Sequence, residues 1–492
     1  MEQTIRSNYS NDKSVLLYLC YPLLFQIAAM LLTVNLLDIK LSLLFIVLNA
    51  VIFTYLFIYY INNITLMIIN IIIMISFQNL FIGLGDMLSA YQSSGLALRP
   101  LLIYKEIISV IVLVLLYLKT NKKIRINNYE KIVPVLVIYL LIELLISGAQ
   151  MESKLYYLRT YLIPFVCYLI GRMAYFEMKT KSGIKPIINT VTVIGVMAVV
   201  IGFIFLLISV DSSLWRDIFH LGLISEAKTG RYEDFPRWYT PIGPLYLRRM
   251  FSFFFDSISL SYFLITSLIC SMLIRKRIML PIQLLLFAGL IFTFGKGAIG
   301  MLLILMVIII CIHYMKINAK WFVTAFLVVM GIAYEFVYNF NFRSSASVHF
   351  DGLMGPLMNI FYSPLGHGLG IGGNYFAILN NVKAWDISST GAESFIGVMI
   401  YQLGFPGIVM FLFFFISMMR NLLSAYATAD SEERFRYIVL YATAFSILIA
   451  SLFQESTMGL NYTGILFMLI GFYVSKSKEF NVRQYQAKGE NV

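Results

Sequence analysis

Charged residues are scarce in this sequence, and cysteine and histidine are rarer still. Asp, Glu, Lys and Arg make up only 13% of the 492 residues, whereas 60% are hydrophobic. A water-soluble globule could not hide that much apolar surface inside one core. The scarcity of charge therefore excludes an ordinary soluble domain and predicts a polytopic membrane protein.

The few cysteines and histidines exclude several kinds of site. All four cysteines lie inside apolar segments without paired loop spacing, which predicts no disulfide framework. The four histidines do not cluster, and no Asp-x-Asp motif is present that could hold a metal ion. We therefore expect neither a metal ion nor a cofactor.

The charge that is present is mostly basic, with a formal net charge of +12. Lys and Arg stand in short clusters between apolar runs, as the positive-inside rule predicts, so we assign this charge to membrane topology and expect no nucleic-acid partner. The first apolar run begins near Val15 without a small-residue cleavage pattern and is expected to be a retained helix.

Apolar runs of about 17 to 20 residues, the length that crosses a bilayer, recur along the chain. They predict an all-α polytopic membrane protein with about 14 transmembrane helices, in a single integral membrane domain that covers residues 1–492. The predicted spans are 15–37, 41–60, 64–83, 101–118, 132–148, 160–177, 186–210, 251–274, 278–294, 298–315, 321–337, 394–418, 437–454 and 462–475.

Basic residues fall in every alternate connection between these spans if the N-terminus is cytoplasmic. Both termini are then cytoplasmic, and the larger loops 211–250 and 338–393 are extracytoplasmic. Among the cations left outside are Arg159, Lys296 and Arg343. The first two lie at a helix end or in a short connection, where a bound anion would offset the cost of translocating charge. Snorkelling or paired interface residues are the alternative.

The longest outside loop contains a glycine-rich run from Ser363 to Gly373. Its glycines can expose successive backbone N–H groups in a concave nest that suits a phosphate or pyrophosphate, although a flexible turn has the same composition. The glycines concerned are Gly366, Gly368 and Gly370. His367 suits acid–base chemistry or a hydrogen bond to phosphate, with a structural role as the alternative.

Charged residues also stand at the entry to two predicted spans. Glu393 either stabilises the N-terminus of the helix that follows it or acts as a general base toward an attacking hydroxyl. Arg248 and Arg249 can hold a diphosphate bidentately, with Asp256 fixing one of them, whereas an interfacial anchor would need the same residues.

Taken in order, these motifs resemble the bacterial O-antigen polymerase and ligase superfamily, which includes Wzy-type polysaccharide polymerases. The resemblance covers roughly a third of the chain, from about residue 247 to residue 412. It is carried by R-x-x-S-x-x-x-D from Arg249, F-T-x-x-K-G from Phe292, S-P-L-G-H-G-L-G from Ser363, and A-E-S-F from Ala392 followed by Y-Q-L-G-F-P-G-I from Tyr401.

The resemblance implies a membrane glycosyltransferase that acts on undecaprenyl-diphosphate-linked sugars without a metal ion. By it, Arg249, Lys296 and Arg159 fall where the family places cations for the lipid diphosphate. Glu393 takes the position of the base, with His367 as second choice. Ligases commonly have a His-Asn pair at this position, so the Glu-Ser found here looks more like the polymerases.

We therefore expect a polymerase of O-antigen, capsule or exopolysaccharide repeat units at the outer face of the bacterial cytoplasmic membrane. Its expected partners are undecaprenyl-diphosphate-linked oligosaccharides and the lipid bilayer, and the resemblance implies a flippase and a chain-length regulator. A flippase or exporter for the same sugars is the main alternative, which should have pseudo-symmetric halves and ionisable groups near the midplane. An O-antigen ligase and a scaffold without chemistry are the others.

Overall fold

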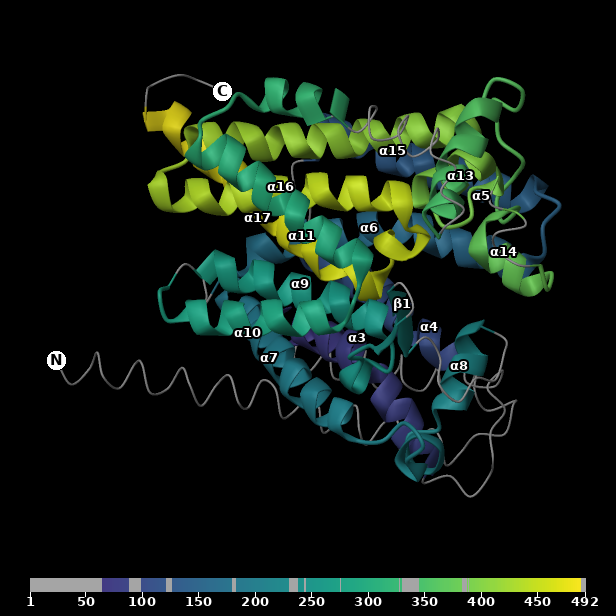
Figure 1. The fold of residues 1–492 in the computed structure, drawn as a ribbon. Coiled ribbons are helices and arrows are strands. Elements are labelled where there is room, and N and C mark those ends of the chain that lie inside the picture. The colour runs from purple at the N-terminus through teal and green to yellow at the C-terminus, as the bar shows by residue number, and fades with distance from the viewer. Residues whose placement is uncertain are drawn as a thin grey trace. The chain divides into compact units, whose positions relative to one another are not determined.

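Helices make up almost all of the described chain in this computed structural model (Figure 1). The structure describes residues 64–87, 99–120, 126–178, 183–229, 238–242, 245–274, 276–326, 328–329, 345–382, 387 and 389–487. The α-helices are α3 (Ile64–Met87), α4 (Arg99–Thr120), α5 (Ile132–Ile146), α6 (Met151–Met178), α7 (Lys185–Leu207), α8 (Leu221–Thr229), α9 (Ser257–Ile274), α10 (Met279–Phe292), α11 (Lys296–Ile308), α13 (Ser345–Asn359), α14 (Gly373–Leu379), α15 (Phe395–Thr428), α16 (Ser431–Phe453) and α17 (Ile465–Ala487).

Five helices of the described chain are long and apolar enough to cross a membrane. They are Lys185–Leu207, Ser257–Ile274, Lys296–Tyr314, Phe395–Thr428 and Glu433–Phe453. The coarse prediction of a helical membrane protein is therefore confirmed. The predicted spans 15–37 and 41–60 lie outside the described residues, each other predicted span overlaps a helix, and the number of fourteen stays a prediction.

The chain divides into two compact units, and each is discontinuous in sequence. Unit 1 is Met1–Asn121 with Met173–Gly295, and unit 2 is Lys122–Arg172 with Lys296–Val492. Helix α6 begins in unit 2 and ends in unit 1. The sequence predicts a single membrane domain, and this stays a prediction.

In unit 1, the helices α7, α9 and α10 pack against one another, and α3 packs against α4. The described residues of the predicted outer loop 211–250 form local secondary structure. It holds α8 and the antiparallel hairpin of β1 (Tyr239–Ile242) and β2 (Leu245–Arg248). Next to the hairpin, Trp238 stacks on Phe251 with ring centroids 4.4 Å apart, within a buried aromatic cluster.

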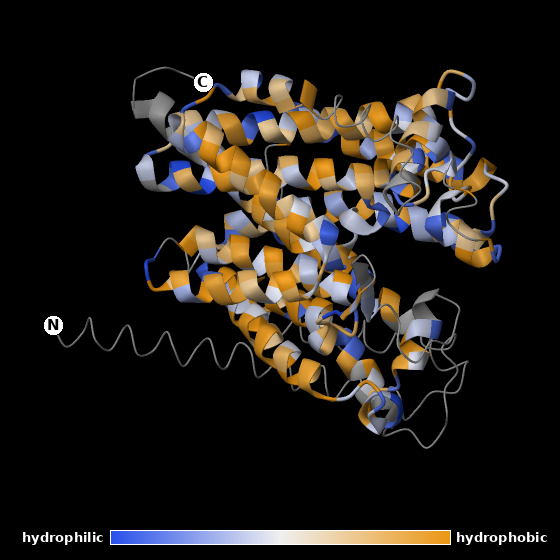
Figure 2. Ribbon diagram, in the orientation of Figure 1, coloured by the Kyte–Doolittle hydropathy of each residue, from blue (hydrophilic) through white to orange (hydrophobic). Residues whose placement is uncertain are grey.

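In unit 2, α15 packs along α16 and α11 packs along α16. Apolar residues run along these helices and hydrophilic residues gather toward their ends (Figure 2). Aromatic rings fill the core between them, because Phe411 and Phe414 of α15 pack edge-on against Phe165 of α6, and Phe415 packs edge-on against Phe467 of α17.

A break in α15 fixes the glycine-rich run in place. Pro406 has no N–H for the carbonyl of Gln402, and Gly404 has a positive φ of 59°, so the helical ladder is interrupted. The run supplies the missing partners, since the N–H of His367 donates to Tyr401 O (2.8 Å) and that of Gly368 donates to Gln402 O (3.0 Å). In return, the N–H of Phe405 donates to Pro364 O (2.8 Å).

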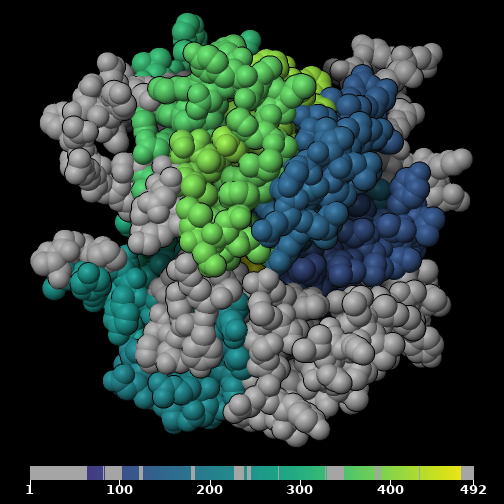
Figure 3. All heavy atoms as spheres, turned by 90° about the vertical axis from the view of Figure 1, so that its right-hand side faces the viewer, coloured from purple at the N-terminus to yellow at the C-terminus, as the bar shows by residue number. Residues whose placement is uncertain are grey.

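The described residues of the segment 345–393 gather at one end of the unit 2 helices, beside the turn between α5 and α6 (Figures 1 and 3). Ser147 and Ser153 fasten it there, because their hydroxyls donate to the carbonyls of Leu369 (2.7 Å) and Gly370 (2.6 Å). At the opposite end of the same helices, Lys476 of α17 pairs with Glu433 of α16 at 2.8 Å. Unit 2 therefore has one loop-rich end, and the opposite end is basic because it carries Lys316, Lys320, Arg420, Arg434 and Arg436 at or near the helix ends.

Candidate functional site

Glu393 lies at the loop-rich end of unit 2, immediately before α15. The N-cap of α15 is Ser394, whose hydroxyl accepts from Gly397 N at 2.9 Å, so the carboxylate of Glu393 is not used as the cap. The Glu393 side chain is about one-third exposed, and one of its oxygens lies 3.8 Å from His349 Nδ1. Its φ of +68° is uncommon for a residue other than glycine.

A second carboxylate, that of Glu455, lies near that of Glu393. Glu455 begins the short helix η7 (Glu455–Met458) in the connection between α16 and α17, and it is only 4% exposed. Its Oε1 accepts from the hydroxyl of Tyr157 at 2.7 Å, and its Oε2 accepts from the N–H of Asn374 at 2.8 Å. Glu455 lies in the connection between two spans and therefore joins it to the start of α6 and to the start of α14.

Burial raises the pKa of Glu455 from 4.5 to about 7, and the neighbouring negative charge of Glu393 adds to the rise. Hydrogen bonds from Tyr157 and from the backbone of Asn374 and Glu393 lower the same pKa in part. The site thus holds two carboxyl groups in unlike surroundings. The buried one binds a proton near neutral pH, while the other is about one-third exposed.

The glycine-rich run reaches this pair at its last residues. Gly373 N donates to the hydroxyl of Thr390 (3.3 Å), three residues before Glu393, and the next N–H is the one that Asn374 gives to Glu455. Gly372 O accepts from Nε2 of Gln402 at 3.3 Å. The run and Glu393 are thereby joined through α14 and the broken part of α15.

The first glycines of the run are engaged within the protein. Gly366 N donates to Ser363 O at 2.9 Å, and Gly368 N donates to Gln402 O at 3.0 Å. Gly366, Gly368 and Gly370 all have positive φ, and a Cβ on Gly370 would lie 2.8 Å from the backbone N of Lys154. Close packing accounts for these glycines, and a phosphate nest at the first two would require their present bonds to break.

The other predicted residues of unit 2 surround this arrangement less closely. His367 is exposed and stacks on Tyr401 with ring centroids 4.2 Å apart. Arg159 of α6 lies over the ring of Tyr156, with its guanidinium carbon 4.9 Å from the ring centroid. Lys296 is exposed at the first position of α11. Arg343 lies outside the described residues.

The predicted residues of unit 1 take part in the fold. Arg248 donates to the carbonyls at the end of α7, at 2.6 Å to Ile208 O, which suits a cation at a helix C-terminus. Arg249 Nε donates to Thr293 O at 2.9 Å, three residues along the chain from Lys296. The carboxylate of Asp256 accepts from Ser259 N at 3.2 Å and caps α9. Their proposed contact with a diphosphate stays a prediction.

No protein-family model matches this chain, and no curated protein matches it either.

Reasoning from the sequence missed Glu455 and His349. Glu455 carries a weak signal, because it is an acid in the short connection directly after a predicted span. His349 carries none, since its proximity to Glu393 depends on α13 packing against α15. The loop segment does bring a histidine to Glu393, and the residue that lies within 3.8 Å of its carboxylate is His349.

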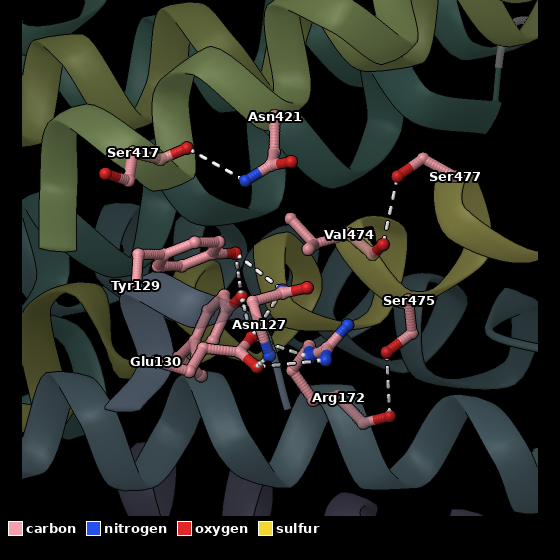
Figure 4. Close-up of polar contacts among 10 residues, drawn as sticks. Asn127, Tyr129, Glu130, Arg172, Ser417, Asn421, Val474, Ser475 and Ser477 are labelled. Carbon is pink, nitrogen blue, oxygen red and sulfur yellow. Dashed lines mark hydrogen bonds and ion pairs between the residues drawn. The ribbon is translucent and has the colours of Figure 1, made fainter. Parts of the chain in front are cut away.

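A second buried acid lies toward the other end of unit 2 (Figure 4). Glu130, in the turn η2 (Asn128–Lys131), pairs with Arg172 of α6, with Nε 2.9 Å from Oε1. It also accepts from the hydroxyl of Tyr168 (2.7 Å) and from the side-chain amide of Asn127 (2.9 Å). Ser475 of α17 donates to Arg172 O at 3.0 Å, so the network ties α17 to α6.

Proposed function

We propose that this protein is a membrane glycosyltransferase that polymerises undecaprenyl-diphosphate-linked oligosaccharide repeat units. The observation that carries the proposal is the carboxylate of Glu393, which is partly exposed, is not used to cap α15, and belongs to a residue in an uncommon backbone conformation beside a protonatable acid. Outlying backbone conformations cluster at functional sites. The order of the sequence motifs supports the substrate class.

In the proposed reaction, a hydroxyl of the acceptor repeat unit attacks the anomeric carbon of the donor. Glu393 takes the hydroxyl proton as the new C–O bond forms. The bond from the anomeric carbon to the diphosphate oxygen breaks, and the lipid diphosphate leaves with the electron pair. The proposal assigns the charge of this leaving group to Arg159, Lys296 and Arg249, which would favour its departure by neutralising it.

The two ends of unit 2 support the proposed sidedness. Lys316, Lys320, Arg420, Arg434 and Arg436 lie at or near helix ends opposite the loop-rich end. By the positive-inside rule, that end faces the cytoplasm, and the end with Glu393 faces outward. Lipid-linked repeat units would then be joined at the outer face of the cytoplasmic membrane, with both termini of the protein in the cytoplasm.

The direct test incubates the purified protein with lipid-linked repeat units and separates the products by length. A polymerase yields a ladder of longer glycans. Glu393→Gln should slow the ladder about 10²- to 10⁴-fold, the usual contribution of a general base, and Arg249→Ala should also slow it. Glu177→Gln is the matched control, because it neutralises another partly exposed glutamate, which pairs with Lys119 near the end of α6.

The same assay separates the alternative functions. A flippase moves the repeat unit without lengthening it, and a ligase joins glycan to a different acceptor, so neither yields a ladder. If the wild-type protein forms no ladder, or if Glu393→Gln forms one at the wild-type rate, the proposal fails. A strain without the protein should carry single repeat units at its surface, whereas loss of all surface glycan would favour a flippase.

A further inference from the structure

Glu455 is a buried acid for which the proposed reaction has no use so far. It is held by two donors from different elements, the Tyr157 hydroxyl of α6 and the Asn374 N–H of α14, and both are uncharged. The titratable groups that face it include Tyr156, Tyr157 and Tyr161 of α6, and Glu393 at the start of α15. Tyr156 in turn faces Arg159, Tyr375 and Tyr462. Neither donor brings a positive charge that would favour the ionised form.

The same geometry fits a neutral carboxylic acid. A protonated Glu455 presents one O–H and one carbonyl oxygen, and the carbonyl can accept from Asn374 N while the O–H donates to Tyr157 Oη. A tyrosine hydroxyl can exchange its roles as donor and acceptor, so both contacts survive protonation. Ionisation would instead place two negative charges at one site, where an anionic diphosphate must also approach.

We propose that Glu455 is a positioning residue that works as a neutral acid behind Glu393, holding α6, α14 and the start of α15 together without adding negative charge to the site. The inference rests on the proposed function, because it concerns the same site and the same anionic substrate. It identifies an acid that neither the motif order nor the resemblance includes. Glu455 touches neither substrate nor reacting atoms, so its effect passes through Glu393 and α14.

The test follows the rate of ladder formation against pH. The wild-type rate should fall about tenfold per pH unit above the titration of Glu455, whose pKa is about 7. Glu455→Gln keeps a carbonyl for Asn374 and an N–H for Tyr157, so it imitates the neutral acid. This variant should keep the wild-type rate near pH 6.5 and lose the decline at higher pH.

A second measurement does not depend on activity. Infrared titration of the purified protein should reveal a protonated carboxyl group that disappears near pH 7 and is absent from Glu455→Gln. In Glu393→Gln the midpoint should move to lower pH, because a neighbouring negative charge has been removed. If Glu455 had only a structural role, Glu455→Gln would keep the pH profile of the wild type, and Glu393→Gln would leave the carboxyl midpoint in place.

The outcomes separate the two proposals. If the wild type forms no ladder at any pH, the proposed function fails, whatever the infrared titration gives. If ladders form but Glu455→Gln keeps the alkaline decline, or if Glu393→Gln leaves the carboxyl midpoint in place, the inference is overturned. Should Glu455→Gln not fold, Tyr157→Phe gives the same decision, because loss of its hydrogen bond should move both the midpoint and the decline to higher pH.

Discussion

Two of the buried acids of unit 2, Glu130 and Glu455, differ in what stabilises them. Glu130 and Glu455 are each 4% exposed, and each accepts a 2.7 Å hydrogen bond from a tyrosine of α6. Glu130 also has the guanidinium of Arg172 at 2.9 Å. The hydrogen bonds to Glu455 come from uncharged groups, and the charged residue beside it is a second carboxylate.

This difference in partner gives the two acids different roles. A buried charge is tolerated when it is paired and hydrogen-bonded, so the network of Glu130 acts as a charged clamp between η2, α6 and α17. A buried acid without a cation gains more by binding a proton. The clamp lies toward the basic end of unit 2, and the protonatable acid lies at the end that carries Glu393.

The largest expected effect comes from breaking the clamp. Arg172→Met leaves Glu130 as an uncompensated buried charge, and we expect a loss of about 3–5 kcal/mol in the free energy of unfolding. Denaturant unfolding of the purified protein measures it. The double variant with Glu130→Gln removes both charges and should regain most of this loss. An Arg172→Met protein as stable as the wild type would contradict the view of this pair as a clamp.

The next effect is the dependence of stability on pH. The pKa of Glu455 is about 7 in the folded protein and about 4.5 when unfolded, so the folded state holds a proton that the unfolded state has released between these values. Its contribution is therefore full below pH 4.5 and is lost as the pH rises through about 7. The contribution is on the order of 3 kcal/mol.

The Tm of the wild type, compared with that of Glu455→Gln across this pH range, measures the contribution. The two proteins should diverge as the pH rises, with the variant becoming the relatively more stable one. Parallel curves would show that Glu455 titrates normally, and its burial would then need another explanation.

The sequence predicts the helices because the signal for each one, a run of apolar residues, is local. Apolar runs of spanning length predicted helices that the structure contains, such as α7 and α9. The glycine content of the run from Ser363 to Gly373 was equally visible in the sequence. The partners of the run were not, because the interrupted ladder at Gly404 and Pro406 and the loop that completes it lie on separate segments of the chain.

In the candidate site, too, contacts between residues far apart in the sequence could not be predicted. Glu393 was readable as an acid directly before a span, whereas Glu455 is bonded to Tyr157, which lies 298 positions away in the chain. A single sequence gives no information on such a contact. The hydrogen bonds of Arg248 have the same limit, since the carbonyls at the end of α7 that it caps become visible only once the hairpin is folded back.

The smallest expected effect tests the hydrogen bonds that the two acids share. Tyr157→Phe removes the 2.7 Å bond to Glu455, and Tyr168→Phe removes the 2.7 Å bond to Glu130, so the bonds to the two acids are matched in chemistry and length. Each variant also removes a second contact of the same hydroxyl, with Tyr375 N at 3.3 Å or with the Tyr129 hydroxyl at 2.7 Å. Each should cost about 1–2 kcal/mol of stability, since one hydrogen bond contributes about 1 kcal/mol. Because the bond from Tyr157 lowers the pKa of Glu455, its loss should move the carboxyl midpoint and the alkaline decline of activity upward. Tyr168→Phe should leave the carboxyl midpoint and the alkaline decline unchanged, because the carboxyl group that titrates is that of Glu455. Equal shifts in the two variants would remove the distinction between a clamped charge and a protonatable acid.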